Sequence, residues 1–248
     1  MKVTVIYGNS RRGTTWRFAR LFLEGLDGAE VTEFFLPRDF DSACTGCMGC
    51  IMEGEAHCPH AGALAPILAA LEGADLIVLS SPVYAMGMSG AMKCLCDHLA
   101  WSWTVHRPLP AMFSKVGVVI STAAGPCTGK TCRDLKQQLF YWGVPKAFSW
   151  GEAVGGGWDY LDDRKKAALE RKAKRLAARA RRAVGRTRPG LKLRAWFRLM
   201  TVIRKTNSIP GDTAYWRERG WLDGGRPWRD NPHRPSGGAP LPKGPFVL

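Results

Sequence analysis

Residues 3–15 read VTVIYGNSRRGTT, a short apolar run that leads directly into a loop of glycine, hydroxyl and arginine side chains. The apolar run is continuous rather than alternating, which is typical of a strand buried on both faces of a parallel sheet. A helical pattern over residues 15–26 follows the loop. A strand, a polar loop and a helix in immediate succession predict the first unit of an α/β fold.

The same succession recurs along the first 150 residues. Buried strands are predicted over 76–79 and 116–120, and weaker strands over 31–36 and near 147–150. Helical patterns lie between them at 62–73, 89–102 and 129–142. Strands that alternate with helices in this way predict an open, doubly wound parallel sheet.

The composition excludes several classes of protein. The 248 residues are 46% hydrophobic and 23% charged with a mean hydropathy of −0.16, which is typical of a soluble globular protein rather than a disordered one. The apolar runs are shorter than the roughly 20 residues that span a bilayer, and the N-terminus turns polar at Asn9, too early for a signal peptide. We therefore expect a cytoplasmic protein whose eight cysteines are thiols or ligands rather than disulfides.

The positive charge is concentrated in the C-terminal part of the chain. The total is +15, and residues 164–205 hold 17 Lys and Arg against the single acid Glu170. Outside this window the chain is close to neutral, so the basic character belongs to an extension. Gly155-Gly156-Gly157 separates the two parts. We predict a domain over 1–155, and a basic helical extension with a Gly/Pro-rich tail over 156–248.

Two helices are predicted in this extension. Asp162 and Asp163 can cap a long helix that reaches about residue 184. Its apolar stripe consists of Leu169, Ala173, Leu176, Ala177 and Ala180. A shorter second helix places Trp196, Leu199, Met200 and Ile203 on one side. From Gly224 onward, Gly, Pro and polar residues predominate and indicate a tail.

The basic helix admits two interpretations. Its cations could contact nucleic acid or an anionic membrane, with an affinity that falls steeply with salt. Alternatively, they form a solvated helix face, and the Leu/Ala stripe docks on the sheet or on a second subunit. We favour the solvated face because no aromatic side chain interleaves with the cations between 164 and 190.

Ligands of open parallel sheets bind beyond the carboxyl ends of the strands, and three loops there have an unusual composition. Residues 8–15 combine glycines, hydroxyls and Arg11 and Arg12 at the start of a helix, which suits an anion. Residues 81–90 combine Tyr84 with two methionines and small residues, which suits a flat apolar ring. Ordinary helix caps and core packing would explain either loop as well.

The third loop, residues 122–131, contains a relaxed phosphate-binding (Walker A) pattern from Ala124 to Thr131. A nucleotide triphosphatase is therefore a competing hypothesis. We interpret the pattern as incidental, because no later apolar strand ends in an Asp suited to hold Mg²⁺. The loop also follows the fourth strand, which is late in the chain for that fold.

Four cysteines with short spacers lie between the second strand and the next helix: Cys44, Cys47, Cys50 and Cys58. Two-residue spacers let thiolates from one tight loop point inward, and the seven-residue spacer lets Cys58 close the shell. Four thiolates suit a 4Fe–4S cluster or tetrahedral zinc. Because His57 and His60 lie nearby in the sequence, zinc remains an alternative to the cluster. A thiol loop without metal is a third alternative. The remaining cysteines, Cys94, Cys96, Cys127 and Cys132, have no ligand-like spacing and are interpreted as buried apolar side chains. His98 and His106 are interpreted as structural.

These motifs together resemble the flavodoxin-like superfamily of NAD(P)H-dependent FMN reductases and quinone reductases. The iron–sulfur flavoprotein branch is the most similar. Residues 8–15 resemble the superfamily's FMN-phosphate loop, with Asn9 where a serine is usual. Ser81-Pro82-Val83-Tyr84 and the stretch from Gly87 to Asp97 resemble its isoalloxazine loop and the helix after it, and Thr122-Ala123-Ala124-Gly125 resembles its third flavin loop. The cysteine set resembles the cluster motif of the iron–sulfur branch. The resemblance covers about residues 1–150.

The resemblance implies a five-stranded flavodoxin-like domain that uses FMN and NAD(P)H. The implied phosphate-binding residues are Asn9, Ser10, Arg11, Gly13, Thr14 and Thr15. The ring-binding residues are Pro82, Val83, Tyr84, Ala85, Met86, Gly87, Ser89, Thr122, Ala123, Ala124 and Gly125. Cys44, Cys47, Cys50 and Cys58 are the implied ligands of a 4Fe–4S cluster, and no catalytic acid or base is implied.

Electrons would pass from NAD(P)H to a quinone, a flavin or a protein acceptor. The alternative is a flavodoxin-like electron carrier or redox sensor that binds flavin without turning over NAD(P)H. We also expect a homo-oligomer.

Overall fold

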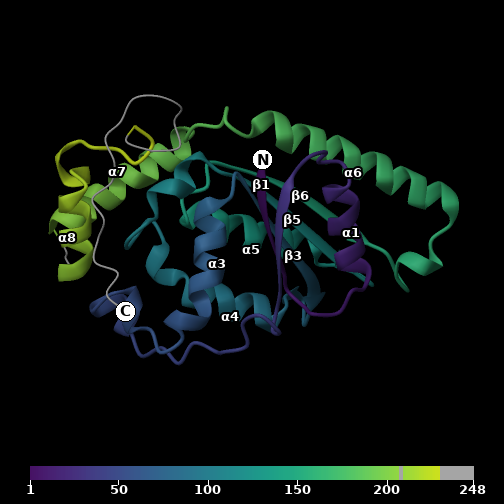
Figure 1. Ribbon diagram of the computed structural model, residues 1–248, viewed down its shortest axis with the longest axis horizontal. Helices are drawn as coiled ribbons and strands as arrows, with labels where there is room; N and C mark the ends of the chain where they lie inside the picture. Colours follow the sequence, from purple (N-terminus) through teal and green to yellow (C-terminus); the bar gives the residue numbers. More distant parts are fainter. Residues whose placement is uncertain (207–208, 230–248) are drawn as a thin grey trace.

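The computed structural model describes residues 1–206 and 209–229. Five parallel strands form the central sheet, and a two-residue strand adds an antiparallel hairpin to one of them (Figure 1). The strands are β1 (Lys2–Tyr7), β2 (Glu30–Phe35), β3 (Leu76–Tyr84), β4 (Gly87–Met88), β5 (Val116–Ala123) and β6 (Lys146–Ala153). Apart from the short β4, their order β2-β1-β3-β5-β6 is that of the flavodoxin-type doubly wound sheet. The predicted fold class is confirmed.

The register of the sheet explains why the strand sequences are continuously apolar. Val5 of β1 pairs with Val78 of β3, and Val78 pairs with Val118 of β5. These three side chains belong to the core on one face of the sheet. The next residues along the strands belong to the core on the other face: Ile6, Leu79 and Val119. Because both faces are covered, neither set of alternating positions needs to be polar.

Helices α1 (Thr14–Leu23) and α6 (Asp163–Ala183) cover one face of the sheet (Figure 1). The Oδ1 atom of Asp162 accepts a hydrogen bond of 2.6 Å from the backbone N–H of Lys165, so Asp162 caps α6 as predicted. The predicted stripe of α6 is buried in the same core as β1 and α1. The two helices approach so closely that a Cβ on Gly25 would lie 2.7 Å from that of Ala177.

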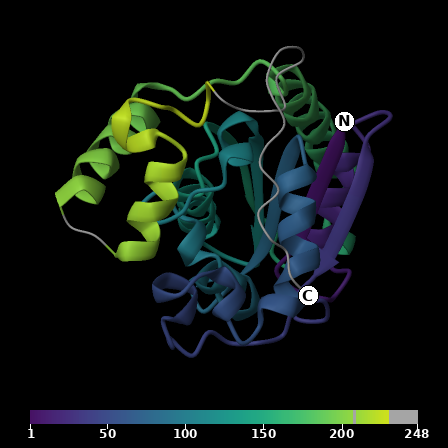
Figure 2. The same cartoon turned by 60° about the vertical axis from the view of Figure 1, so that its left-hand side comes forward.

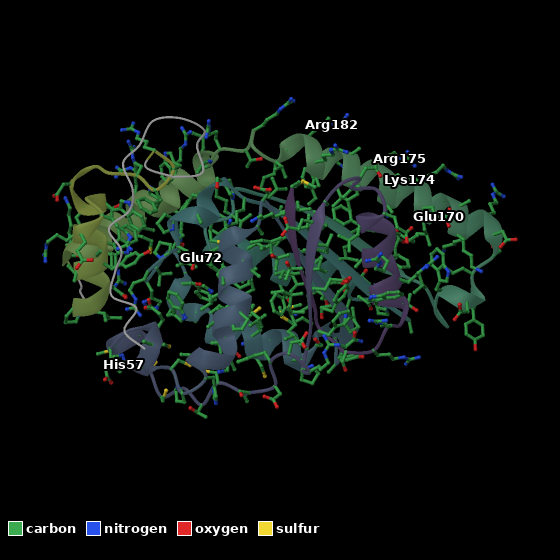
Figure 3. The ribbon with its side chains drawn as sticks, viewed as in Figure 1. His57, Glu72, Glu170, Lys174, Arg175 and Arg182 are labelled. Atoms are coloured by element: carbon green, nitrogen blue, oxygen red, sulfur yellow. The ribbon has the colours of Figure 1, made fainter. Side chains whose placement is uncertain are left out.

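Charged side chains lie on the outer side of α6, whereas Lys172 pairs with Glu152 of β6 and the Arg179 guanidinium lies 5.2 Å from the ring of Phe148. Glu170, Lys174, Arg175 and Arg182 follow one another along the helix, away from the sheet (Figure 3). The Leu/Ala stripe therefore docks on the sheet, and the cations remain on an exposed helix face.

The opposite face of the sheet is covered by α3 (Ala61–Gly73), α4 (Gly90–His98) and α5 (Thr128–Tyr141). The predicted helix over 89–102 ends at His98, and residues Ala100–Ser102 form the separate 3-10 turn η2. Further short segments are α2 (Gly49–Met52), η1 (Glu55–His57), η3 (Pro110–Ser114) and η4 (Trp158–Tyr160). Both α2 and η1 lie within the cysteine-rich segment.

The chain then crosses to the other side of the molecule, where α7 (Leu191–Thr206), α8 (Pro210–Glu218) and η5 (Trp221–Asp223) lie opposite α6 (Figure 2). Their side chains form a third apolar cluster around Phe197, Trp216 and Trp221, and Phe113 of η3 joins it. Helix α8 was not predicted. It is short and begins with Pro210-Gly211, and the burial of Trp216 stabilises it.

Part of the predicted tail packs on this cluster, because the ring of Trp228 lies 5.2 Å from that of Phe197. The rest of the predicted tail, residues 230–248, lies outside the described residues. No described helix combines the length and the hydropathy that crossing a membrane requires.

Candidate functional site

The three predicted loops meet at the carboxyl ends of β1, β3 and β5. Asn9 of the first loop donates a hydrogen bond of 3.2 Å from Nδ2 to the hydroxyl of Tyr84 in the second loop. The Ser89 hydroxyl of the second loop donates to the carbonyl of Gly8 at 2.5 Å. The hydroxyls of Thr15 and Thr122 lie 2.6 Å apart and join the first loop to the third. The structure therefore brings the predicted ligand loops together into one site.

The second and third loops also touch each other at the outer side of the site. The sulfur atoms of Met86 and Cys127 lie 3.8 Å apart. Lys130 of α5 reaches over the hairpin, with its Nζ atom 4.0 Å from where a Cβ on Gly87 would be. Lys130 pairs with Asp134 one turn later on α5, at 2.7 Å. The lysine of the Walker A pattern is thus in an ordinary surface ion pair, which supports our interpretation of that pattern as incidental.

The first loop leaves its backbone donors unused. Helix α1 begins at Thr14, and Gly13 at its N-cap makes no side-chain capping bond. Within the described chain, no hydrogen bond to another residue occupies the N–H groups of residues 9–16. These donors lie at the positive end of the helix dipole, which is the usual environment of a bound phosphate. The loop therefore fits the phosphate of FMN.

The second loop forms the turn of a hairpin between β3 and β4. Its two central residues, Ala85 and Met86, have φ angles of 45° and 66°, which side-chain-bearing residues adopt at a cost. Tyr84 and Met86 are 52% and 59% exposed although both side chains are large and mostly apolar. A turn that holds apolar side chains in the open next to a phosphate loop suits a flat ring such as isoalloxazine.

A fourth loop, which the sequence analysis did not assign to the site, follows β6. The N–H groups of Val154 and Gly155 donate to the carbonyls of Ala123 and Ala124 at 2.9 and 3.2 Å. The N–H of Trp158 donates to the Thr14 hydroxyl at 3.3 Å. We interpreted Gly155-Gly156-Gly157 as a break between domains. The signal for the site was that these glycines follow a strand, as the other three loops do.

The four predicted cysteine ligands lie in the chain between β2 and α3, and they line one cavity of about 290 Å³ together with the end of α4. Their thiols are all free. Burial raises the pKa of Cys50, and the nearby thiols of Cys58, Cys44 and Cys47 raise it further, whereas Arg107 lowers it. A cationic centre would relieve the repulsion between these thiolates, so the donor set fits an iron–sulfur cluster or zinc.

A buried ion-pair network anchors the backbone of the cysteine loop. Arg107 donates from its guanidinium to the carbonyls of Cys50 and Ile51, the latter at 3.1 Å, and to Asp212 at 2.8 Å. Asp212 belongs to α8 and is fully buried, and it also accepts from Arg204 at 3.0 Å. The ring of His106 lies 2.7 Å from the same carboxylate, which bears out its structural interpretation. The C-terminal helices thus fix the backbone that carries Cys50.

Two histidines complete the cavity. His60 and His98 face each other across 2.9 Å between their Nδ1 and Nε2 atoms, and His98 Nδ1 lies 2.7 Å from the Cys94 carbonyl oxygen. Cys58, His60 and His98 each place a potential ligand atom within 4.8 Å of the others. His57 is 56% exposed beside Glu53, on the outer short helices of this segment (Figure 3). Of the two histidines considered for zinc, only His60 lines the cavity.

The four other cysteines divide into two kinds. Cys96 and Cys132 are buried, and burial raises their pKa values to about 12 and about 11. These two thiols are apolar core side chains, as predicted. Cys94 and Cys127 are only partly buried, and Cys127 stands at the site beside Met86.

Comparison with known proteins identifies the family of the chain. The family model described as NADPH-dependent FMN reductase matches residues 1–155. The chain belongs to this family. It is therefore an FMN-dependent NAD(P)H oxidoreductase by descent, and the predicted resemblance is confirmed.

Two curated relatives share the name iron-sulfur flavoprotein. The protein of Archaeoglobus fulgidus is 26% identical over 230 residues, which cover 90% of this chain and all of that protein. The protein of Methanocaldococcus jannaschii is 36% identical over 131 residues, which cover 50% of this chain and 63% of that protein.

Among solved structures, an FMN-dependent NADH-azoreductase of Bacillus anthracis in complex with FMN matches with a TM-score of 0.57 at 13% identity. The match covers 72% of this chain and 99% of that one. At this level of identity the match supports the fold alone.

Proposed function

We propose that the chain binds FMN between the three loops and a 4Fe–4S cluster on Cys44, Cys47, Cys50 and Cys58, and that it reduces a quinone, a flavin or a protein with electrons from NAD(P)H. When bound, FMN accepts a hydride from NAD(P)H and passes the electrons on. A 4Fe–4S cluster would add exchange of single electrons. The convergence of the three loops around unused backbone donors carries this proposal.

The chain's own groups bind and orient the phosphate of FMN. The free N–H groups of residues 9–16 donate to it, and Arg11 and Arg12 add positive charge at the same loop. The hydroxyl of Thr15 is not expected to contact the phosphate, because it is buried and already paired with that of Thr122. Thr15 instead fixes the first loop against the third.

The ring of FMN would lie against residues 82–89 and 122–125. The turn around Met86 supplies an apolar surface, and the backbone of Thr122 to Gly125 supplies polar groups to the ring edge. Asn9 connects the two parts of the ligand site through its hydrogen bond to Tyr84. The residues thus position the ring, and no acid or base among them is required for hydride transfer.

The cysteine loop would hold the cluster in a place that the rest of the fold prepares. Arg107 is buried, with 5% of the residue exposed. Its guanidinium donates to the backbone carbonyls of Cys50 and Ile51. Its positive charge opposes the repulsion among four thiolates. The two curated relatives are named iron-sulfur flavoproteins, which supports the proposal that this chain also holds a cluster.

One experiment tests the flavin assignment. Protein purified without oxygen should show flavin absorbance, bind one FMN per chain and oxidise NAD(P)H when a quinone or free FMN is supplied. A protein that binds FMN without turnover would be a carrier or sensor. A colourless protein that takes up no FMN contradicts the proposal.

The cluster is tested separately by iron and sulfide analysis. We expect four irons and four sulfides per chain and a brown chromophore. Cys47→Ala should lose this chromophore and keep FMN, whereas Cys96→Ala, which removes a thiol from the core, should keep both. Zinc in place of iron would contradict the cluster assignment.

A further inference from the structure

Cys58 has a second set of neighbours besides the other three cysteines. Its thiol lies within 4.8 Å of one ring nitrogen of His60 and one of His98, and all three residues line the same cavity. From these contacts we propose that Cys58, His60 and His98 form a mononuclear zinc site, distinct in its ligands from the four-cysteine set. The zinc site does not depend on the proposed cluster.

The distance between the two ring nitrogens is close to the one that a tetrahedral metal requires. The facing nitrogens of His60 and His98 are 2.9 Å apart. Zn–N bonds of about 2.0–2.1 Å at tetrahedral angles place two ligand nitrogens about 3.3 Å apart. The pair therefore needs to separate by only a few tenths of an ångström, and the 290 Å³ cavity leaves room for the ion and a solvent ligand.

The ring of His98 is already oriented as a metal ligand. Its Nδ1 atom lies 2.7 Å from the carbonyl oxygen of Cys94, which can only accept, so Nδ1 carries the proton and Nε2 has the lone pair. A backbone carbonyl on the far nitrogen is the usual second partner of a zinc-bound histidine. Phe40 packs edge-on against the same ring at 4.8 Å and limits its rotation.

Binding requires two proton changes, both at accessible groups. In the metal-free protein, the proton between the two rings must belong to His60, because His98 Nε2 is the acceptor. His60 therefore changes to the tautomer with its proton on Nε2, and the ring is partly exposed, so solvent can carry that proton. The Cys58 thiol loses its proton to solvent as the Zn–S bond forms. One proton is released per zinc, and no redox change occurs.

The donor set selects a metal of borderline softness. One thiolate and two imidazoles suit Zn²⁺, whereas Mg²⁺ and Ca²⁺ prefer oxygen ligands. Asp97 lines the cavity too, but its carboxylate is paired with Lys93. The inference that zinc and the cluster exclude each other rests on the proposed function, because both sets use the single thiolate of Cys58.

Titration of metal-free, FMN-loaded protein with Zn²⁺ against a chromophoric chelator tests the site. We expect one tight equivalent, and Co²⁺ in its place should give the visible bands of a tetrahedral thiolate complex. His60→Ala and His98→Gln should each weaken Zn²⁺ binding by more than the 10- to 100-fold that loss of an outer partner costs. His57→Ala is the matched control, because His57 is exposed and outside the cavity.

The cysteine variants separate this site from the four-cysteine set. Zn²⁺ binding should survive in the double variant Cys44→Ala, Cys47→Ala, which cannot assemble the cluster. Binding that is lost in the double variant but kept in His60→Ala and His98→Gln overturns the zinc site. A wild-type protein that binds Zn²⁺ no more tightly than His60→Ala does would also overturn the zinc site.

Competition tests the exclusion. Zinc-loaded wild type should resist reconstitution with iron and sulfide, and His60→Ala should take up iron whether or not zinc is present. If wild-type protein forms no cluster under any condition, the proposed function loses its cluster, while the zinc titration still stands or fails by itself. Zinc and a full cluster bound together would overturn the exclusion.

Discussion

At Gly8 the backbone of the first loop passes so close to the second loop that a side chain has no room. A Cβ there would lie 2.6 Å from the Ser89 hydroxyl and 3.0 Å from that of Ser81. The same Ser89 hydroxyl donates to the Gly8 carbonyl. Glycine at this position therefore sets how closely the two loops approach.

Gly8→Ala should separate the two loops and weaken FMN binding about tenfold, which corresponds to about 1.4 kcal/mol. Quenching of FMN fluorescence on titration with apoprotein measures the affinity. Gly62→Ala in α3 is the control, since nothing lies within 4 Å of the added Cβ. Unchanged affinity in Gly8→Ala would contradict the loop arrangement.

Lys115 is a buried cation whose role is structural. It is 2% exposed, and its Nζ donates to the carbonyls of Glu72 and Ala74 at 2.6 and 2.5 Å. These carbonyls lie at the end of α3, where Figure 3 labels Glu72. Burial lowers its pKa from 10.5 to about 8, although Asp75 and Glu72 act in the opposite direction. Between about pH 8 and pH 10.5, Lys115 binds more protons in the unfolded chain than in the folded one. Its contribution to the free energy of unfolding therefore rises with pH over this range.

The free energy of unfolding of wild type should therefore increase relative to Lys115→Met by about 2 to 3 kcal/mol between pH 7.5 and 10.5. Urea unfolding at several pH values measures the difference. Lys136→Met, an exposed position on α5, should run parallel to wild type over this range. A difference between wild type and Lys115→Met that does not change with pH would refute this account.

Helix α8 matters to the site through one carboxylate. Asp212 accepts from Arg107 and Arg204, and its replacement leaves those buried cations without compensation. Asp212→Asn should lower the free energy of unfolding by about 3 kcal/mol or more. It should also speed amide exchange in residues 48–57, because Arg107 then holds the Cys50 and Ile51 carbonyls less firmly.

The control for Asp212→Asn is Glu218→Gln on the same helix. Glu218 is 73% exposed and lies 3.9 Å from Arg219, so its loss should change stability by less than about 0.5 kcal/mol. Exchange in residues 48–57 that stays slow in Asp212→Asn would show that α8 does not hold the loop.

The apolar side of helix α6 packs in the core between the sheet and α1, and the packing of α6 against α1 can be tested at Ala177. This residue is fully buried and faces Gly25 across the close approach of the two helices. Ala177→Leu should overpack the contact and destabilise the protein by about 1–3 kcal/mol in urea unfolding. Ala178→Leu, one residue further on and exposed, should be nearly neutral. Equal effects of the two substitutions would mean that α6 does not pack here.

For the molecule as a whole, the sequence was sufficient to predict those features of the fold and the site that follow from local patterns of residues. Continuous apolar runs predicted strands buried on both faces, and parallel strands bring their carboxyl ends to one edge. The convergence of residues 8–15, 81–90 and 122–131 followed from those two rules. The cysteine spacing likewise predicted four thiols around one cavity.

The remaining features depend on contacts that no local pattern encodes. Arg107 and Asp212 are 105 residues apart, and no local pattern of the sequence pairs them. His98 was interpreted as structural because no nucleophile–base arrangement can be read around it in the sequence, and no local pattern places it beside Cys58. The glycines at 155–157 were interpreted only as a break in the chain, and the hydrogen bond from the Gly155 N–H to the Ala124 carbonyl joins them to the third loop. Helix α8 lacks a strong pattern of its own, and its burial decides its structure.

The exposed cations of α6 predict the behaviour of the whole protein on a polyanion. Because no aromatic side chain interleaves with them along the helix, we expect retention on heparin that is lost at modest salt, and no effect of added RNA on NAD(P)H oxidation. Retention that persists at high salt, or a change in rate with RNA, would instead favour nucleic-acid binding.

The position of Asp212 late in the chain has a consequence for biosynthesis. A ribosome that has made Arg107 needs roughly 5 to 20 seconds to add the 105 residues that end at Asp212. During that interval the cysteine segment is already translated but lacks its carboxylate anchor. The ion pair that joins Arg107 to Asp212 behind the Cys50 and Ile51 carbonyls can therefore form only after α8 has been made.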